Sequence, residues 1–60
     1  MKEHADLSEL DKRIKIIKKA ATEMMEISGG IEAVRRNADR ILASVKMLEI
    51  NISDIIDLEI

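Results

Sequence analysis

The 60-residue chain contains no cysteine, no proline and no aromatic residue. Without cysteine it has neither disulfides nor thiolate metal ligands to stabilise a small fold. A compact domain of about 60 residues buries only about 60% of the surface that its unfolded chain exposes. Closely packed helices, or association with other chains, must therefore supply the stability. At this length the chain is at most one domain, spanning residues 1–60.

Long apolar runs and a strong net charge are also missing. No run reaches the 18 or so residues of a membrane span, although 47% of the residues are apolar. The first six residues lack the apolar stretch of a signal peptide, so we expect a cytoplasmic protein that does not enter membranes. The net charge of −2 favours neither a nucleic-acid binder with a strong global field nor an acidic disordered tail.

Residues that carry out chemistry are scarce. His4 is the single histidine, and the chain has no cysteine or tyrosine, so a positioned imidazole or thiolate nucleophile has no clear source. No phosphate-binding glycine loop and no His-Glu-x-x-His motif occurs. Acidic pairs such as Asp54 with Asp57 are interpreted as solvated surface. These absences predict a protein that is not an enzyme and binds no cofactor or metal.

Helical periodicity is the strongest pattern that the sequence does contain. Apolar residues recur at heptad a and d positions before and after Gly29-Gly30, and only Ser28 and Glu59 interrupt the two series. The apolar positions, which we predict to form an oligomer core, are Leu7, Leu10, Ile14, Ile17, Ala21, Met24, Ile31, Val34, Ala38, Ile41, Val45, Leu48, Ile52 and Ile55.

The two heptad series are out of register with each other, which predicts a turn between them. A continuous helix would have to accommodate two adjacent glycines at about 1 kcal/mol each relative to alanine, whereas Gly29 suits the position just after a helix C-terminus. We therefore expect a helix over about 7–28, a turn at 29–30 and a helix over about 31–60. Asp6 with Glu9, or Ser8 with Asp11, resembles a capping box at the first helix start.

The second predicted helix is longer than the first. If residue i lies beside residue 59 − i, Leu7 lies near Ile52 and the segment from Ser53 onward projects past the first helix. Further apolar residues at e and g positions, and eleven isoleucines, favour a core of more than two helices. The predicted fold is all-α: an antiparallel helical hairpin that self-associates into a four-helix bundle.

A second apolar stripe lies on the far side of the longer helix. Ala43, Met47 and Ile50 are spaced i, i+4, i+7, and Ile16 is expected to lie across from Ala43. The stripe is suited to a second interface that makes a tetramer, or to a partner helix that packs on flexible methionine. Scattered exposed aliphatics are the alternative interpretation. The candidate partner surface comprises Ile16, Ala43, Met47, Ile50, Ile56, Leu58 and Ile60.

Charge alternates along the chain in blocks. Residues 1–11, 12–22, 23–34, 35–46 and 47–60 carry −3, +5, −3, +3 and −4. Folding the hairpin would place both chain ends together as an acidic pole. Two hairpins with their loops at opposite ends would bring that pole toward the arginines of a second copy. Exposed ion pairs contribute only about 0–1 kcal/mol each, so they would select this orientation without driving assembly.

The basic blocks also admit a nucleic-acid alternative. The candidate phosphate contacts are Lys12, Arg13, Lys15, Lys18, Lys19, Arg35, Arg36 and Arg40. Binding through them would depend strongly on salt, and the lack of aromatic residues argues against recognition of single strands. The favoured function is a non-enzymatic interaction or scaffold module that forms a homodimer or a tetramer, and the alternative is a small regulatory bundle that binds nucleic acid.

Overall fold

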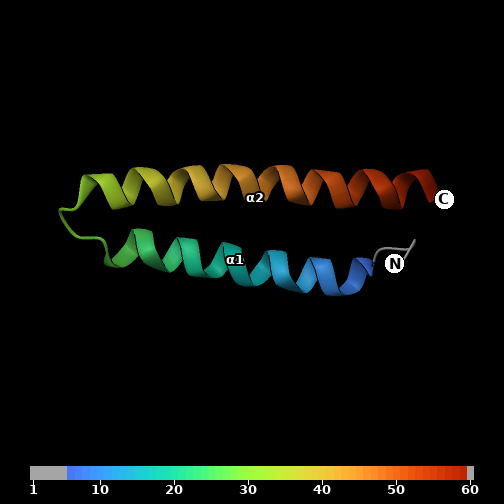
Figure 1. The fold of residues 1–60 in the computed structure, drawn as a ribbon, viewed down its shortest axis with the longest axis horizontal. Coiled ribbons are helices and arrows are strands. Elements are labelled where there is room, and N and C mark those ends of the chain that lie inside the picture. The colour runs from blue at the N-terminus through green and yellow to red at the C-terminus, as the bar shows by residue number, and fades with distance from the viewer. Residues whose placement is uncertain (1–5, 60) are drawn as a thin grey trace, which may run out of the picture.

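The computed structural model describes residues 6–59 of the chain. Its two α-helices, α1 (Leu7–Ile27) and α2 (Glu32–Glu59), pack against each other as an antiparallel hairpin (Figure 1). The predicted helical hairpin is thus confirmed. Helix α1 ends one residue before the predicted position 28, and α2 begins one residue after 31, because Ser28 and Ile31 belong to the turn. His4 and Ile60 lie outside the described residues.

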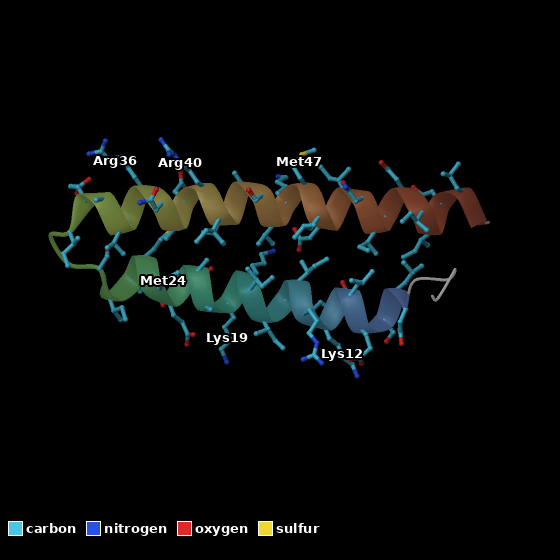
Figure 2. All side chains as sticks on the ribbon, viewed as in Figure 1. Lys12, Lys19, Met24, Arg36, Arg40 and Met47 are labelled. Carbon is cyan, nitrogen blue, oxygen red and sulfur yellow. The ribbon has the colours of Figure 1, made fainter. Side chains whose placement is uncertain are left out.

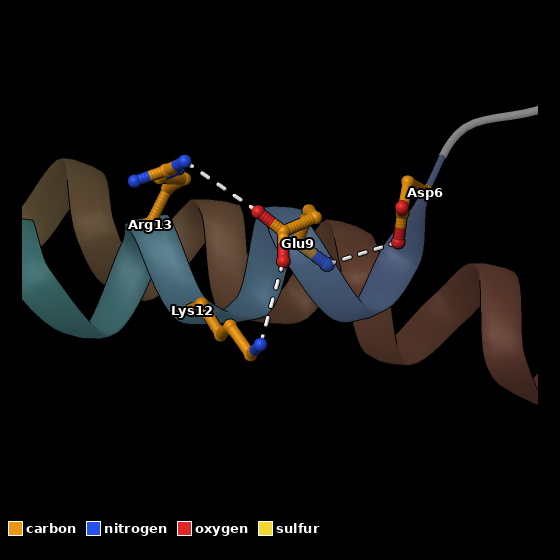
Figure 3. Close-up of polar contacts among 4 residues, drawn as sticks. All are labelled: Asp6, Glu9, Lys12 and Arg13. Carbon is orange, nitrogen blue, oxygen red and sulfur yellow. Dashed lines mark hydrogen bonds and ion pairs between the residues drawn. The ribbon is translucent and has the colours of Figure 1, made fainter.

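The start of α1 is fixed by Asp6, as the first of the two capping signals predicts. Its side-chain Oδ1 accepts a hydrogen bond of 3.0 Å from the backbone N–H of Glu9 (Figure 3). The Glu9 carboxylate lies 3.4 Å from Lys12 Nζ and 3.5 Å from an Arg13 guanidinium nitrogen. A negative charge in the first turn also suits the positive end of the helix dipole.

The turn between the helices depends on one glycine. Gly29 has a φ of 57°, in the left-handed region that residues with a Cβ rarely adopt. The buried Ser28 just before it donates a hydrogen bond from its Oγ to the Met25 carbonyl, and the Ile31 N–H donates one to the Ser28 carbonyl. The Ile31 carbonyl then accepts the first hydrogen bond of α2 from Arg35 N–H. The chain therefore reverses within four residues, as the registers predict.

The core of the hairpin is a narrow row of aliphatic residues between the helices, with two alanines at its centre. The buried apolar residues are Ile14, Ala21, Ala38 and Val45, each no more than 5% exposed. All four occupy heptad a positions. The register in which residue i lies beside residue 59 − i stays a prediction, and the ion pair between the helices joins Lys18 to Glu49, not to residue 41.

Helix α2 has 28 residues and α1 has 21, so α2 extends beyond its neighbour by about 10 Å. Figure 1 shows this extension at the end where α1 begins. The hairpin measures 45 × 18 × 17 Å, which leaves every side chain within one helix radius of the surface. Over residues 6–59, such a thin rod presents its side chains mainly on its sides.

Candidate interaction surfaces

Seven large aliphatic side chains lie along one side of the hairpin. They occupy heptad d positions, and each exposes between 38% and 42% of its surface. We call this row the apolar side. Its members are Leu10, Ile17, Met24, Val34, Ile41, Leu48 and Ile55.

Helix geometry explains why both helices contribute to the same side. A residue three positions after a buried one is rotated by about 60° from the line that joins the helix axes. Because the two helices run in opposite directions, this rotation turns the d residues of both toward one side. A shallow groove of about 360 Å³ on that side is lined by Ile17 from α1 and by Ile41 and Leu48 from α2, among others.

The opposite side of the hairpin is closed by polar and half-buried residues. It is formed by heptad e positions, four residues after the buried ones. Lys18 Nζ on α1 lies 3.3 Å from Glu49 Oε2 on α2, and this ion pair bridges the helices. We call this row the polar side. Its members are Asp11, Lys18, Met25, Arg35, Leu42 and Glu49, and the exposed Ile56 continues the row toward the end of α2.

Asp11 on the polar side also holds a lysine of its own helix. Lys15 Nζ lies 2.9 Å from Asp11 Oδ2. The hydrogen bond to Asp11 and the charge of that carboxylate raise the pKa of Lys15 above its ordinary value, with a smaller contribution from Glu49 and a small opposing desolvation effect. Lysines tuned for acid–base catalysis have lowered pKa values. The raised pKa of Lys15 is therefore typical of a lysine in a surface ion pair.

The predicted oligomer core divides into three classes within one chain. Four of its fourteen residues are the buried row, and Leu7 and Ile52 are half-buried. The other eight are exposed and comprise the apolar side and Ile31. The hairpin therefore shields the a positions, apart from Ile31 in the turn, and leaves the d positions open. Association of these open positions with another chain stays a prediction.

The predicted partner surface is not one continuous patch. Met47, 59% exposed, points away from α1 (Figure 2). Ile16 follows the buried Ile14 by two residues, so it lies about 200° around α1 and faces away from α2. The prediction that Ile16 lies across from Ala43 is therefore wrong in direction. The two residues lie on opposite outer surfaces of the hairpin.

The remaining members of the predicted partner surface lie near the end of α2. Ile56 is exposed, and Leu58, 86% exposed, is on the segment that extends beyond α1. Ile60 lies outside the described residues.

Charged residues continue the Ala43, Met47 and Ile50 stripe in both directions. Arg36, Arg40 and Met47 all project from the outer side of α2 in Figure 2. We call the whole exposed row the α2 outer face. Its members, separated alternately by four and three residues, are Arg36, Arg40, Ala43, Met47, Ile50, Asp54 and Asp57. Sequence reasoning identified only the apolar middle, although the same spacing would have revealed the charged ends.

The candidate phosphate contacts do not form one basic surface. Lys12 and Lys19 point outward from α1, whereas Arg36 and Arg40 point outward from α2 on the opposite surface of the hairpin (Figure 2). Lys12, Arg13, Lys15 and Lys18 each form an ion pair with a carboxylate of the same chain. Arg35 borders a depression that also contains Glu32 and Asp39. On the two outer surfaces, the basic residues of α1 and α2 therefore face in opposite directions, whereas Lys18 and Arg35 share the polar side.

Within residues 6–59, no group of three or more histidine or acidic side chains is placed to hold a metal ion. Neither helix, as described, is both long enough and apolar enough to cross a membrane. No protein-family model, curated protein or solved structure matches the chain.

Proposed function

We propose that this chain is a non-enzymatic self-association module. Two hairpins stack with their apolar sides together and form a four-helix bundle that serves as an interaction or scaffold unit. The observation that carries this proposal is the uniform exposure of the apolar side: seven heptad-spaced aliphatic residues from two helices, each about two fifths exposed. Helices in proteins obtain most of their stability by packing such a face.

The size of the apolar side supports a second copy as its occupant. With about 200 Å² for a fully exposed large aliphatic residue, the seven members expose roughly 550 Å², near the upper end for the largest apolar patch on a monomer. Two apolar sides together would bury roughly 1,100 Å², which passes the ~1,000 Å² expected of a biological interface. The chain exposes 5165 Å² in total, compared with about 4,000 Å² for a compact protein of its mass.

The small residues beside the apolar side permit close approach. Positions g, next along the helix surface, hold Ala20 on α1 and Asn37, Ser44 and Asn51 on α2, with the larger Ile27 and Leu58 near the ends of the two helices. Long charged side chains are rare there, with Arg13 as the exception. A second helix layer can therefore lie directly on the aliphatic row.

The unequal helix lengths favour stacking with the loops at opposite ends. Met24 and Val34 lie near the loop end of the hairpin, and Ile55 lies near the free end of α2. Antiparallel stacking places Ile55 of one copy over Met24 and Val34 of the other. Parallel stacking would place the two extensions together, and with them the acidic ends of both chains. Packing and charge therefore favour the same orientation.

The association is tested by one substitution on each kind of surface. Light scattering of the wild type at micromolar concentration should give the mass of two or four chains. Ile41→Asp places a carboxylate in the middle of the apolar side and should yield an unfolded monomer, because folding and association are coupled in such dimers. Ile16→Asp is the matched control on an outer surface and should keep the wild-type mass. A folded wild-type monomer, or equal effects of the two variants, contradicts the proposal.

The orientation is tested by cysteine cross-linking, which the absence of native cysteine simplifies. Val34 and Ile55 lie 21 residues apart on one helix, so a disulfide between these positions must join two chains. The double variant Val34→Cys/Ile55→Cys should form covalent dimers on oxidation, and each single variant should not. Absence of covalent dimers from the double variant would contradict antiparallel stacking.

A further inference from the structure

The α2 outer face carries charges of opposite sign at its two ends, at similar distances from its centre. Two arginines, Arg36 and Arg40, occupy its N-terminal part, and two aspartates, Asp54 and Asp57, occupy its C-terminal part. The apolar middle is centred on Met47. All of these residues are exposed. Among the described residues, no ion pair joins any of the four charged members to another residue of the chain.

This distribution is complementary to itself when a second α2 runs in the opposite direction. If two copies cross at Met47, Arg36 lies opposite Asp57 and Arg40 lies opposite Asp54. The same pairs occur twice, as a two-fold axis requires. Ala43 of each copy then lies opposite Ile50 of the other. A parallel pairing would instead place arginine on arginine and aspartate on aspartate.

We propose that the α2 outer face is a second self-association surface, which joins two copies antiparallel about a two-fold axis at Met47. The occupant is another copy of this chain, because the charges of the face complement that same face reversed. The inference rests on the proposed function, since it joins bundles already formed through the apolar side. Lys46 lies at the edge of this contact, where its long stem lets the ammonium reach water.

The two interfaces together define the size of the assembly. Antiparallel stacking of the apolar sides pairs Ile41 with Leu48, so its axis crosses α2 between these residues, about two residues from Met47. The two axes are perpendicular, because one surface faces sideways from the hairpin and the other faces outward from α2. Perpendicular two-fold axes close an assembly at four chains when they intersect, so closure requires the two contacts to share one level along α2. The α2 outer face thus joins two four-helix bundles into a closed tetramer.

The second interface is the weaker of the two. Only three apolar residues per copy contribute, so its strength depends on charge pairs that salt screens. The tetramer should separate into dimers as ionic strength rises, whereas the contact between apolar sides should persist.

Charge reversal tests the pairing in sedimentation velocity. The wild type at low salt should sediment as four chains. Arg36→Glu/Arg40→Glu should sediment as two, and so should Asp54→Lys/Asp57→Lys, because each variant opposes like charges across the axis. An equimolar mixture of the two variants restores opposite charges at every pair and should recover four chains. The control Lys12→Glu/Lys19→Glu makes the same change in net charge on the outer surface of α1 and should keep the wild-type mass.

The outcomes separate this inference from the proposed function. A wild type of one chain overturns both. A wild type that stops at two chains at low salt overturns the second interface alone and leaves the α2 outer face to a helix of another protein. The antiparallel charge pairing is overturned if the Arg36→Glu/Arg40→Glu variant still sediments as four chains. It is also overturned if the mixture of the two variants sediments as two chains. Circular dichroism of each variant confirms its helix content, and recovery in the mixture distinguishes lost pairing from lost folding.

Discussion

Ile41 and Leu42 are neighbours in the sequence, but they lie on different sides of the hairpin. Leu42 belongs to the polar side and is half-buried, whereas Ile41 belongs to the apolar side and is 38% exposed. The polar side is bridged between the helices by Lys18 and Glu49. Among the described residues, no ion pair bridges the helices on the apolar side.

The difference shows how one helix pair can be complete on one side and open on the other. Long lysine and glutamate stems cover apolar surface while their charged ends stay in water, so the polar side needs no partner. The apolar side offers large aliphatic side chains, and Arg40 is the charged residue that lines its groove. The direction of association is therefore determined by which heptad position carries the long polar residues.

The largest expected effect comes from truncating Ile41. Ile41→Ala should lower the free energy of unfolding by about 2–5 kcal/mol, the cost for a residue buried in a core, because stacking buries it. Leu42→Ala should cost about 1 kcal/mol, since Leu42 stays half-buried in either state. Chemical denaturation of both variants at one protein concentration provides the comparison.

Concentration dependence serves as the control for this pair. The melting temperature of the wild type should rise with protein concentration, as for any fold that requires association. If Ile41→Ala costs no more than Leu42→Ala, the two sides are equivalent and the apolar side has no partner.

The supersecondary structure follows from the sequence because its determinants are local. Asp6 is a capping residue, Gly29 permits a left-handed turn, and the change of heptad register at this point requires a reversal. Helix bounds differ from prediction by one residue because the cap and turn residues have apolar or small side chains that fit either assignment.

The arrangement of the surfaces is harder to predict from the sequence, because it depends on the angle at which each side chain leaves its helix relative to the other helix. A heptad pattern assigns Ala21 and Met24 to the same stripe, but only the packed pair shows that a positions close the hairpin while d positions stay open. The same limit explains the error about Ile16, which was placed by its level along the hairpin and not by its angle around α1. The sequence likewise does not show directly that the basic residues on the outer surfaces of α1 and α2 point in opposite directions, because this also depends on angles around the helices.

A smaller effect is expected from the ion pair that bridges the polar side. Lys18 and Glu49 side chains are 54% and 40% exposed, so a double-mutant cycle with Lys18→Gln and Glu49→Gln should give a coupling of about 0.2–1 kcal/mol. The coupling should weaken at high salt, and each variant should keep the wild-type mass in light scattering. Loss of assembly in either single variant would show that the polar side contributes to an interface.

The smallest effect concerns Lys15 on the edge of the polar side. Asp11 raises the pKa of Lys15 in the folded chain, so the folded state holds this proton more tightly than the unfolded state does. The resulting stabilisation is fully present below the ordinary lysine pKa and is lost as pH rises through the raised value. Asp11→Asn removes the acceptor charge and should move the titration of the Lys15 side chain, followed by the NMR shift of its Cε, to lower pH.

The stability of a Lys15→Gln variant, measured as a function of pH, should show the same dependence on the Lys15 charge. Its small deficit relative to the wild type at neutral pH should disappear once the pH exceeds the raised pKa, because the wild-type lysine is then also neutral. If Asp11→Asn leaves the Lys15 titration unchanged, the 2.9 Å contact does not persist in solution. The polar side would then depend on the Lys18–Glu49 bridge and its half-buried aliphatic residues alone, and its contrast with the apolar side would reduce to the packing of Met25 and Leu42.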